Sequence, residues 1–203
     1  MPAKYIVIDT ETTGLNPFRH ALVQLGFLFL DEKLEVIESG CVDILPITEY
    51  ECDPIATKIT GFTIERIQKG MDQKKTLTDF YDLVSGYFPL VEDEDGKFEK
   101  SKIVWVGQFF PFDYAVMQKA FSDADMIEQF GHIFGNSFID TKSDVLAQNL
   151  KAELKGNTIP YPVTSLSAPG GLKEVFGITE FQAHDALGDC HATRLVLKGL
   201  LEG

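Results

Sequence analysis

The sequence has few of the features that mark secreted or membrane proteins. No apolar run approaches the ~20 residues that a membrane-spanning helix requires, and the first residues, MPAKYIVID, contain no charged lead before a long apolar stretch. Its three cysteines stand at wide, irregular positions, which argues against a disulfide framework and a zinc site. We therefore expect a cytoplasmic protein that contacts no membrane. Its buried free thiols would be Cys41, Cys52 and Cys190.

Positive charge is also scarce in this sequence. The 203 residues include 18 lysines and arginines against 31 aspartates and glutamates, which gives a net charge of −13. This balance argues against a protein that coats long duplex DNA, because such proteins usually present a basic face. It is compatible with an enzyme that holds one chain end, since bound cations supply a local positive field. The basic segment 57–76 and the acidic segment 91–101 are most simply solvated surface.

The chain contains an ordered series of strand-like and helical segments, without internal repeats or low-complexity linkers. Apolar runs predict strands at 4–9, 21–30, 34–45, 102–107 and 137–140. Helical spacing predicts helices at 54–60, 63–70, 77–88, 111–121, 141–154, 170–178 and 186–201. Strands first, and then strands that alternate with helices, favour an α/β fold with a mixed sheet flanked by helices. We expect residues 1–203 to form one domain.

Two carboxylates follow the first buried run. In YIVIDTETTGLNP, Asp9 and Glu11 are two positions apart and share one face of the expected strand, while Thr10 points to the other face. Like charges at the end of a covered strand repel each other and are poorly solvated. A divalent cation would relieve both problems, and oxygen ligands of this type suit Mg²⁺ or Mn²⁺. The alternative is that Asp9 caps the turn and Glu11 is exposed.

Two further acids lie on apolar helix faces. Asp113 and Asp189 each begin a stripe of apolar residues at helical spacing. The stripes are Val116, Met117 and Ala120 for the first acid, and Ala192, Val196 and Leu200 for the second. A buried carboxylate is costly unless it is paired or binds a metal, so we expect both acids to join Asp9 and Glu11 in one cluster. The alternative for each is an ordinary hydrogen-bonded residue at a helix N-terminus.

A histidine precedes the last of these acids. Five helical steps would place His184 and Asp189 about 140° apart, so both reach one site only if His184 lies in the loop and Asp185 caps the helix. Histidine titrates near neutral pH and can take a proton from water. The alternative is an ordinary surface histidine. We expect the other histidines to be structural: His20, His132 and His191.

Taken together, these residues resemble the DEDDh family of 3′–5′ exonucleases, which includes the proofreading subunit of bacterial DNA polymerase III, ribonuclease T and oligoribonuclease. IVIDTETTGL at 6–15 matches the first family motif, and AHDALGDCHAT at 183–193 matches the H-x-A-x-x-D of the third. VGQFFPFD at 106–113 stands where the family often has VGHNxxFD. Gln108 and Phe109 thus replace a frequent His-Asn pair near the substrate, and this departure bears on substrate preference.

The resemblance implies an RNase H-like fold and a metal-dependent exonuclease that releases 5′-mononucleotides from the 3′ ends of single-stranded DNA or RNA. It implies two divalent cations, Mg²⁺ or Mn²⁺, with His184 taking a proton from the attacking water. The implied metal ligands are Asp9, Glu11, Asp113 and Asp189. The resemblance also allows a homodimer, which the residues themselves do not specify.

The resemblance assigns the turn after the first two acids to the terminal nucleotide. The residues concerned are Thr12, Thr13, Gly14 and Leu15, with Gly14 allowing a close approach of the backbone. Phe18, Phe109 and Phe110 are candidate stacking surfaces for unpaired bases. The alternative for each phenylalanine is core packing.

Two other functions stay open at this point. The first is a catalytically silent nuclease-like domain that acts as a nucleic-acid or protein interaction module, which the charge of −13 keeps in view. The second is a phosphatase of the haloacid dehalogenase type, because residues 9–13 loosely resemble its D-x-D-x-T loop. That chemistry needs a later lysine, for which Lys142 or Lys173 is available, but it leaves His184 without a role.

Overall fold

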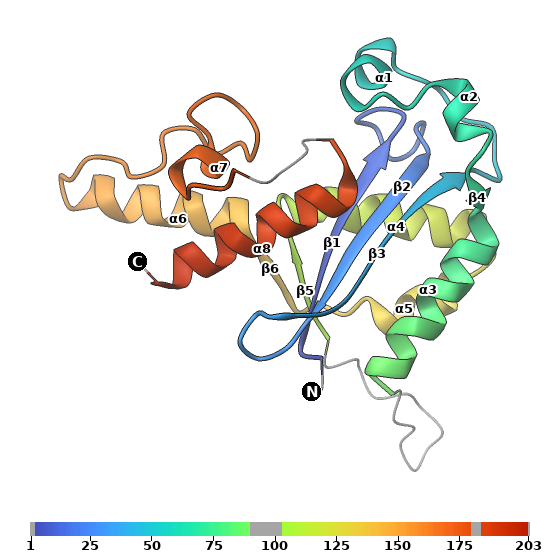
Figure 1. Cartoon of the computed structure of the whole chain (residues 1–203), viewed down its shortest axis with the longest axis horizontal. Coiled ribbons are helices and arrows are strands. Elements are labelled where there is room, and N and C mark those ends of the chain that lie inside the picture. Colours follow the sequence, from blue (N-terminus) through green and yellow to red (C-terminus); the bar gives the residue numbers. More distant parts are fainter. Residues whose placement is uncertain (1–2, 90–102, 180–183, 203) are drawn as a thin grey trace.

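The computed structural model describes residues 3–89, 103–179 and 184–202. Its centre is a six-stranded sheet in the order β4-β3-β2-β1-β5-β6 (Figure 1). The strands are β1 (Tyr5–Thr12), β2 (Leu22–Leu30), β3 (Val36–Leu45), β4 (Met71–Asp72), β5 (Val104–Gly107) and β6 (Phe138–Asp140). The helices are α1 (Pro54–Thr60), α2 (Ile64–Ile67), α3 (Gln73–Tyr87), α4 (Phe110–Asp123), α5 (Ile127–Ile133), α6 (Thr141–Leu154), α7 (Leu172–Val175) and α8 (Ala186–Glu202). This α/β arrangement confirms the expected mixed sheet flanked by helices.

The central strand β1 has different neighbours along its two edges. It pairs antiparallel with β2 from Tyr5, opposite Leu30, to Thr12, opposite Leu22. Its parallel pairing with β5 covers only Tyr5 to Val7. Among the described strands, none therefore lies beside the second half of β1 on the β5 side. This half of the strand contains both of the first two acids.

Alternate residues of β1 face different helices. Ile6 and Ile8 belong to a core that contains buried residues of α3, α4 and α5, whereas Val7 packs with Cys190 and Leu197 of α8. Figure 1 shows α8 crossing one face of the sheet and α4 lying behind it. Because side chains alternate along a strand, the following acids share the α8 face with Val7, and the intervening Thr10 shares the α4 face.

The sequence predicted most elements but missed two. The helices at 54–60 and 141–154 have the expected bounds. The short strand β4 and helix α5 were not predicted, and α5 has only seven residues with Gly131 among them, which weakens its helical signal. The acidic segment 91–101 lies outside the described residues. Within the residues that the structure describes, no helix is long and apolar enough to span a membrane.

The prediction of buried thiols was wrong for two of the three cysteines. All three are free, but only Cys190 is buried, and Cys41 and Cys52 are exposed. Cys190 faces the sheet from α8, where it packs with Val7. Cys41 lies on β3, which is largely exposed along its length, and Cys52 lies in the loop before α1. Spacing along the sequence could not separate these environments.

Helix α8 begins directly against β2. A Cβ atom added to Gly26 of β2 would lie 2.4 Å from the carbonyl carbon of Ala186, the first residue of α8. No real Cβ tolerates such a distance to a main-chain atom, so one of the two backbones would have to move. The absence of a side chain at Gly26 therefore sets how closely α8 approaches the sheet.

We predict that Gly26→Ala destabilises the protein by about 1–3 kcal/mol, the usual cost of overpacking a core. The matched control is Gly86→Ala in α3, where a Cβ would meet nothing within 4 Å. Alanine there should stabilise the helix by about 0.5–1 kcal/mol. Thermal unfolding followed by circular dichroism measures both changes. A Gly26→Ala protein as stable as the wild type would contradict the close contact.

Candidate active site

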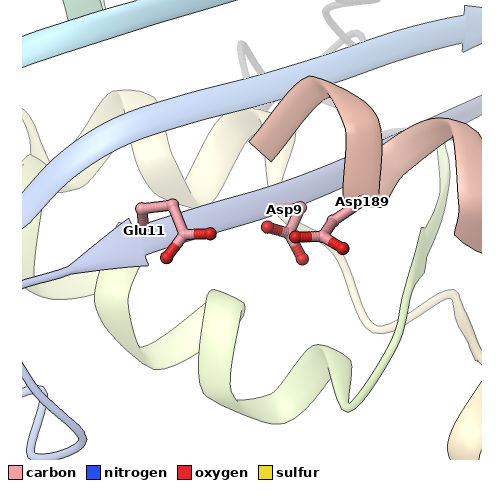
Figure 2. Close-up of side chains that lie close together, drawn as sticks. All are labelled: Asp9, Glu11 and Asp189. Atoms are coloured by element: carbon pink, nitrogen blue, oxygen red, sulfur yellow. The ribbon is translucent and has the colours of Figure 1, made fainter. Parts of the chain in front are cut away.

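Three of the predicted acids meet where α8 crosses β1. Asp9, Glu11 and Asp189 each offer a carboxylate oxygen, and these atoms lie within 4.8 Å of one another. Figure 2 shows the side chains of Asp9 and Glu11 extending from β1 on the same side as Asp189 of α8. Glu11 is 8% exposed, and the other two residues are partly buried. Strand alternation and the apolar stripe of α8 together bring these carboxylates to one place.

The fourth acid, Asp113, approaches β1 from the α4 side. Its Oδ1 atom accepts hydrogen bonds from the main-chain N–H of Thr10, at 2.9 Å, and from the Thr10 hydroxyl, at 2.7 Å. Because β5 has already ended, this carboxylate satisfies a main-chain donor that has no strand partner. Asp113 is 4% exposed. It lies outside the group of three oxygens, but its charge is close enough to raise the pKa values of Asp9 and Glu11.

Burial raises the pKa values of all four carboxyl groups, and the charges of neighbouring acids raise them further. Burial is the main cause for Asp9, followed by the charges of the other three acids, and together they place its pKa well above the ordinary range. Burial, followed by the charge of Asp189, raises the pKa of Glu11 to about 8. Burial also raises the pKa values of Asp113 and Asp189 to about 7. These groups cannot all ionise near neutral pH unless positive charge is brought to them.

The donor set suits a hard divalent cation. All the ligand atoms in the group of three are carboxylate oxygens, and Mg²⁺ and Mn²⁺ prefer such ligands over nitrogen or sulfur. Within the described part of the chain, no second group of acids, histidines or cysteines comes equally close. The raised pKa values point the same way, because a bound cation would stabilise the ionised carboxylates.

His184 lies in the turn directly before α8, as the helical geometry required. Its backbone is left-handed, with φ of 62°, and its main-chain N–H donates to Oδ2 of Asp189 at 3.1 Å. Asp185 caps the helix, because its Oδ2 accepts the N–H of Gly188 at 3.1 Å. The predicted division between loop and cap is therefore confirmed. His184 is exposed to solvent beside an acid of the cluster.

Four of the predicted substrate contacts lie at the end of β1 and in the turn that follows it. Two of their side chains are buried and two are exposed. The hydroxyl of Thr12 donates to the carbonyl of Gly14 at 2.7 Å, and the hydroxyl of Thr13 donates to a carbonyl in the loop before α1 at 2.6 Å. Both threonines are buried, so their side chains shape the turn. Leu15 and Phe18 are 83% and 86% exposed, and these are the apolar side chains that the turn presents to solvent.

The packing within the turn leaves no room for a side chain at Gly14. A Cβ there would lie 2.3 Å from Cε1 of His20. Nδ1 of His20 accepts the N–H of Asn16 at 2.9 Å, so the imidazole holds the turn together, which agrees with its expected structural role. The close approach of a nucleotide to Gly14 stays a prediction.

The residues that replace the usual His-Asn pair have separate surroundings. The Nε2 atom of Gln108 donates to the carbonyl of Thr164 at 3.0 Å and ties the loop before α7 to the end of β5. Phe109 is half-exposed, its φ is 69°, and Nζ of Lys142 lies 4.4 Å from the centre of its ring. Phe110 is 1% exposed and belongs to the core on the α4 face, so its predicted role in stacking on bases was wrong.

One polar residue beside the site was missed by sequence reasoning. Gln24 stands in β2, LVQLGFLFL, in which every residue is buried. Its Oε1 atom accepts the N–H of Ala186 at the start of α8, at 2.8 Å. A single glutamine inside an otherwise apolar run was the available signal, since a buried amide needs partners for both ends.

Comparison with known proteins identifies the family to which the chain belongs. The chain matches the RNase_T exonuclease family over residues 6–197. It is 30% identical over 90 residues to DNA polymerase III subunit epsilon of Haemophilus influenzae, a match that covers 42% of this chain and 34% of that protein. It is 35% identical over 74 residues to the PolC-type DNA polymerase III of Mycoplasmopsis pulmonis, covering 36% of this chain and 5% of that protein. The matched region is thus 34% of one relative and 5% of the other.

Solved structures share the fold. The zinc-bound complex of Escherichia coli exonuclease I with single-stranded DNA has a TM-score of 0.70 and 20% identity, covering 100% of this chain and 41% of that one. Exonuclease I of E. coli with a dT13 oligonucleotide has a TM-score of 0.69 and 22% identity, covering 97% and 40%. These matches confirm the RNase H-like fold, and the family match confirms the resemblance drawn from the three motifs. The chain belongs to the RNase_T family of exonucleases.

Proposed function

We propose that this protein is a metal-dependent exonuclease that removes 5′-mononucleotides from the 3′ ends of single-stranded DNA or RNA. The observation that carries the proposal is the meeting of Asp9, Glu11 and Asp189 within 4.8 Å, in a chain of an exonuclease family. Exonuclease I of E. coli, which shares the fold, has been solved with single-stranded DNA and supports a single strand as the substrate.

The proposed exonuclease domain extends over the whole chain. We take residues 1–203 as one exonuclease domain, because the family match reaches from residue 6 to residue 197. The homodimer and the cytoplasmic location stay predictions. The family match decides against the phosphatase alternative. The interaction module differs from the proposed enzyme in a measurable way, because it would release no nucleotide from DNA or RNA in the presence of Mn²⁺.

Each residue of the site has a defined part in the proposed reaction. Two divalent cations, Mg²⁺ or Mn²⁺, would supply the positive charge that a displacement at phosphorus requires. Asp9, Glu11 and Asp189 would hold them, with Asp113 beside them. His184 accepts a proton from the attacking water as the oxygen of that water bonds to the last phosphorus. The 3′ oxygen of the preceding nucleotide leaves, which yields a 5′-mononucleotide.

The side chains of Leu15 and Phe18, in the turn after β1, and of Phe109, directly before α4, expose apolar surface on segments that adjoin the elements carrying the acids. Base stacking on such side chains tolerates any sequence, because every base has an aromatic face. It also requires few phosphate contacts, which suits a chain with a net charge of −13. We propose that these three residues contact the terminal nucleotides.

His184→Ala should lower turnover by about 10²–10⁴-fold, the usual contribution of a positioned general base. Binding of Mn²⁺ should change little, because the carboxylates remain. Asp9→Ala should lose both activity and Mn²⁺ binding. Release of labelled nucleotides from 3′-labelled single-stranded DNA, duplex DNA, RNA and dinucleotides measures activity, with EDTA as the control, and titration calorimetry measures binding. Full activity of His184→Ala would remove it from the mechanism.

The metal-free protein should lose stability as the pH rises from about 4 to about 8. The raised carboxyl pKa values mean that the folded state keeps protons that the unfolded state releases in this window, so deprotonation favours unfolding. Mn²⁺ should therefore raise the melting temperature more at pH 8 than at pH 5. Asp9→Asn, which removes one charge, should show a shallower pH dependence in EDTA. A wild-type slope that is no steeper than that of Asp9→Asn would contradict the clustered charges.

Phe18→Ala and Phe109→Ala should each raise the KM for oligonucleotides by about fivefold or more, since one stacked base is worth about 1–3 kcal/mol. The matched control is Leu154→Ala, which removes an apolar side chain that is 79% exposed at the far end of α6. Steady-state kinetics on single strands gives the KM values. The stacking role fails if both phenylalanine variants keep the KM of the Leu154→Ala control.

A further inference from the structure

The buried side chain of Gln24 in β2 connects strand β3 to the start of α8. It is 3% exposed, and both ends of its amide are hydrogen-bonded. Its Nε2 atom donates to Oδ1 of Asp43 at 2.8 Å, and its Oε1 atom accepts the N–H of Ala186 at 2.8 Å. A buried amide with a partner at each end is restricted to one position.

The orientation of this amide is set by chemistry. A main-chain N–H only donates hydrogen bonds, so Gln24 must turn its oxygen toward Ala186 and its NH₂ group toward the carboxyl oxygen of Asp43. Asp43 is itself held by Arg66 through two hydrogen bonds, of 2.8 and 3.0 Å. The guanidinium of Arg66 lies 3.7 Å from the centre of the Phe62 ring. This pairing holds the Asp43 carboxyl group in place.

The N–H of Ala186 is one of the helix donors that has no partner within α8. Gln24 satisfies it, while Asp185 caps the N–H of Gly188 two residues later. Gly26, two positions from Gln24 on β2, lets the Ala186 backbone lie directly on the strand. The first turn of α8 is thus fixed by a hydrogen bond and a backbone contact, both from β2.

Gln24 also stands next to the proposed metal ligands. In the antiparallel pairing of β1 and β2 it lies opposite Glu11. Asp189 follows Ala186 by less than one helical turn, and the N–H of His184 is bonded to Asp189. A shift of the α8 start would therefore move both residues relative to β1.

We propose that Gln24 is a positioning residue that places Asp189 and His184 against Asp9 and Glu11 through its hydrogen bond to Ala186. The inference rests on the proposed exonuclease function and extends it to a residue that contacts neither cation nor substrate. A displacement of about 1 Å at a catalytic group can cost about 100-fold in rate. The effect is expected in kcat, because Gln24 bonds to the start of α8, whereas the side chains proposed to contact the nucleotides stand in the turn after β1 and directly before α4.

The protein offers a matched control in a second buried glutamine. Gln73 is 2% exposed; its Nε2 atom donates to the carbonyl of Ala120 at 2.8 Å, and its Oε1 atom accepts the N–H of Ile47 at 3.2 Å. Gln24→Met and Gln73→Met each replace a glutamine by an apolar side chain of similar size. Each substitution removes two hydrogen bonds of the amide. Both should lower the melting temperature. Only Gln24→Met should lower kcat, by about 100-fold, and weaken Mn²⁺ binding, with KM unchanged.

A second variant removes the same hydrogen bond from the other side. Ala186→Pro deletes the donor N–H at the first position of α8, where proline is tolerated. It should lower kcat as Gln24→Met does, and the double variant should be little worse than either single one, because both break one contact. This variant keeps the test available if Gln24→Met fails to fold.

The outcomes separate this inference from the proposed function. Wild-type kcat in Gln24→Met, or an equal loss in Gln73→Met, would overturn the positioning role while the wild type remains an exonuclease. A wild type that releases no nucleotide would overturn the proposed function instead. Hydrogen exchange of the Ala186 amide and Mn²⁺ affinity would still test the geometry. Unchanged values of both in Gln24→Met would overturn the positioning role as well.

Discussion

The site depends on one interruption in the sheet. Strand β1 keeps its antiparallel partner to Thr12 but loses its parallel partner after Val7. The free main-chain N–H of Thr10 is taken by Asp113 from α4, while the acids on the other face of β1 meet Asp189 from α8. A strand paired on both edges could not admit a carboxylate at this position. The incomplete pairing thus lets helices from both faces of the sheet reach one point.

The electrostatics agree with the proposed action of this acidic protein on a polyanion. The described basic residues of segment 57–76 include two that have internal partners, since Arg66 binds Asp43 and Lys75 binds Asp79 at 2.6 Å. That segment is therefore a weaker phosphate-binding surface than its composition indicates. The positive charge needed at the scissile phosphate would come mainly from cations held by the buried acids, and apolar contacts would hold the bases.

Periodicity predicted the residues whose roles follow from one element alone. The helical stripes identified Asp113 and Asp189 as inward-facing, and strand alternation put Asp9 and Glu11 on one face, because these patterns are local. The contributions of Gln24 and Gly26 depend on which helix covers β2, which no local pattern specifies. Phe110 was misassigned for a related reason. A phenylalanine at the start of a helix is buried or exposed according to the neighbours that pack there.

The contact between Gln24 and Ala186 joins residues that are 162 positions apart. During synthesis on the ribosome, β1 and β2 emerge long before α8, so a nascent chain carries Asp9 and Glu11 without the helix that completes the cluster. The two acids alone would then lack the third carboxylate of the cluster. The proposed nuclease chemistry would thereby be confined to chains whose translation has passed α8.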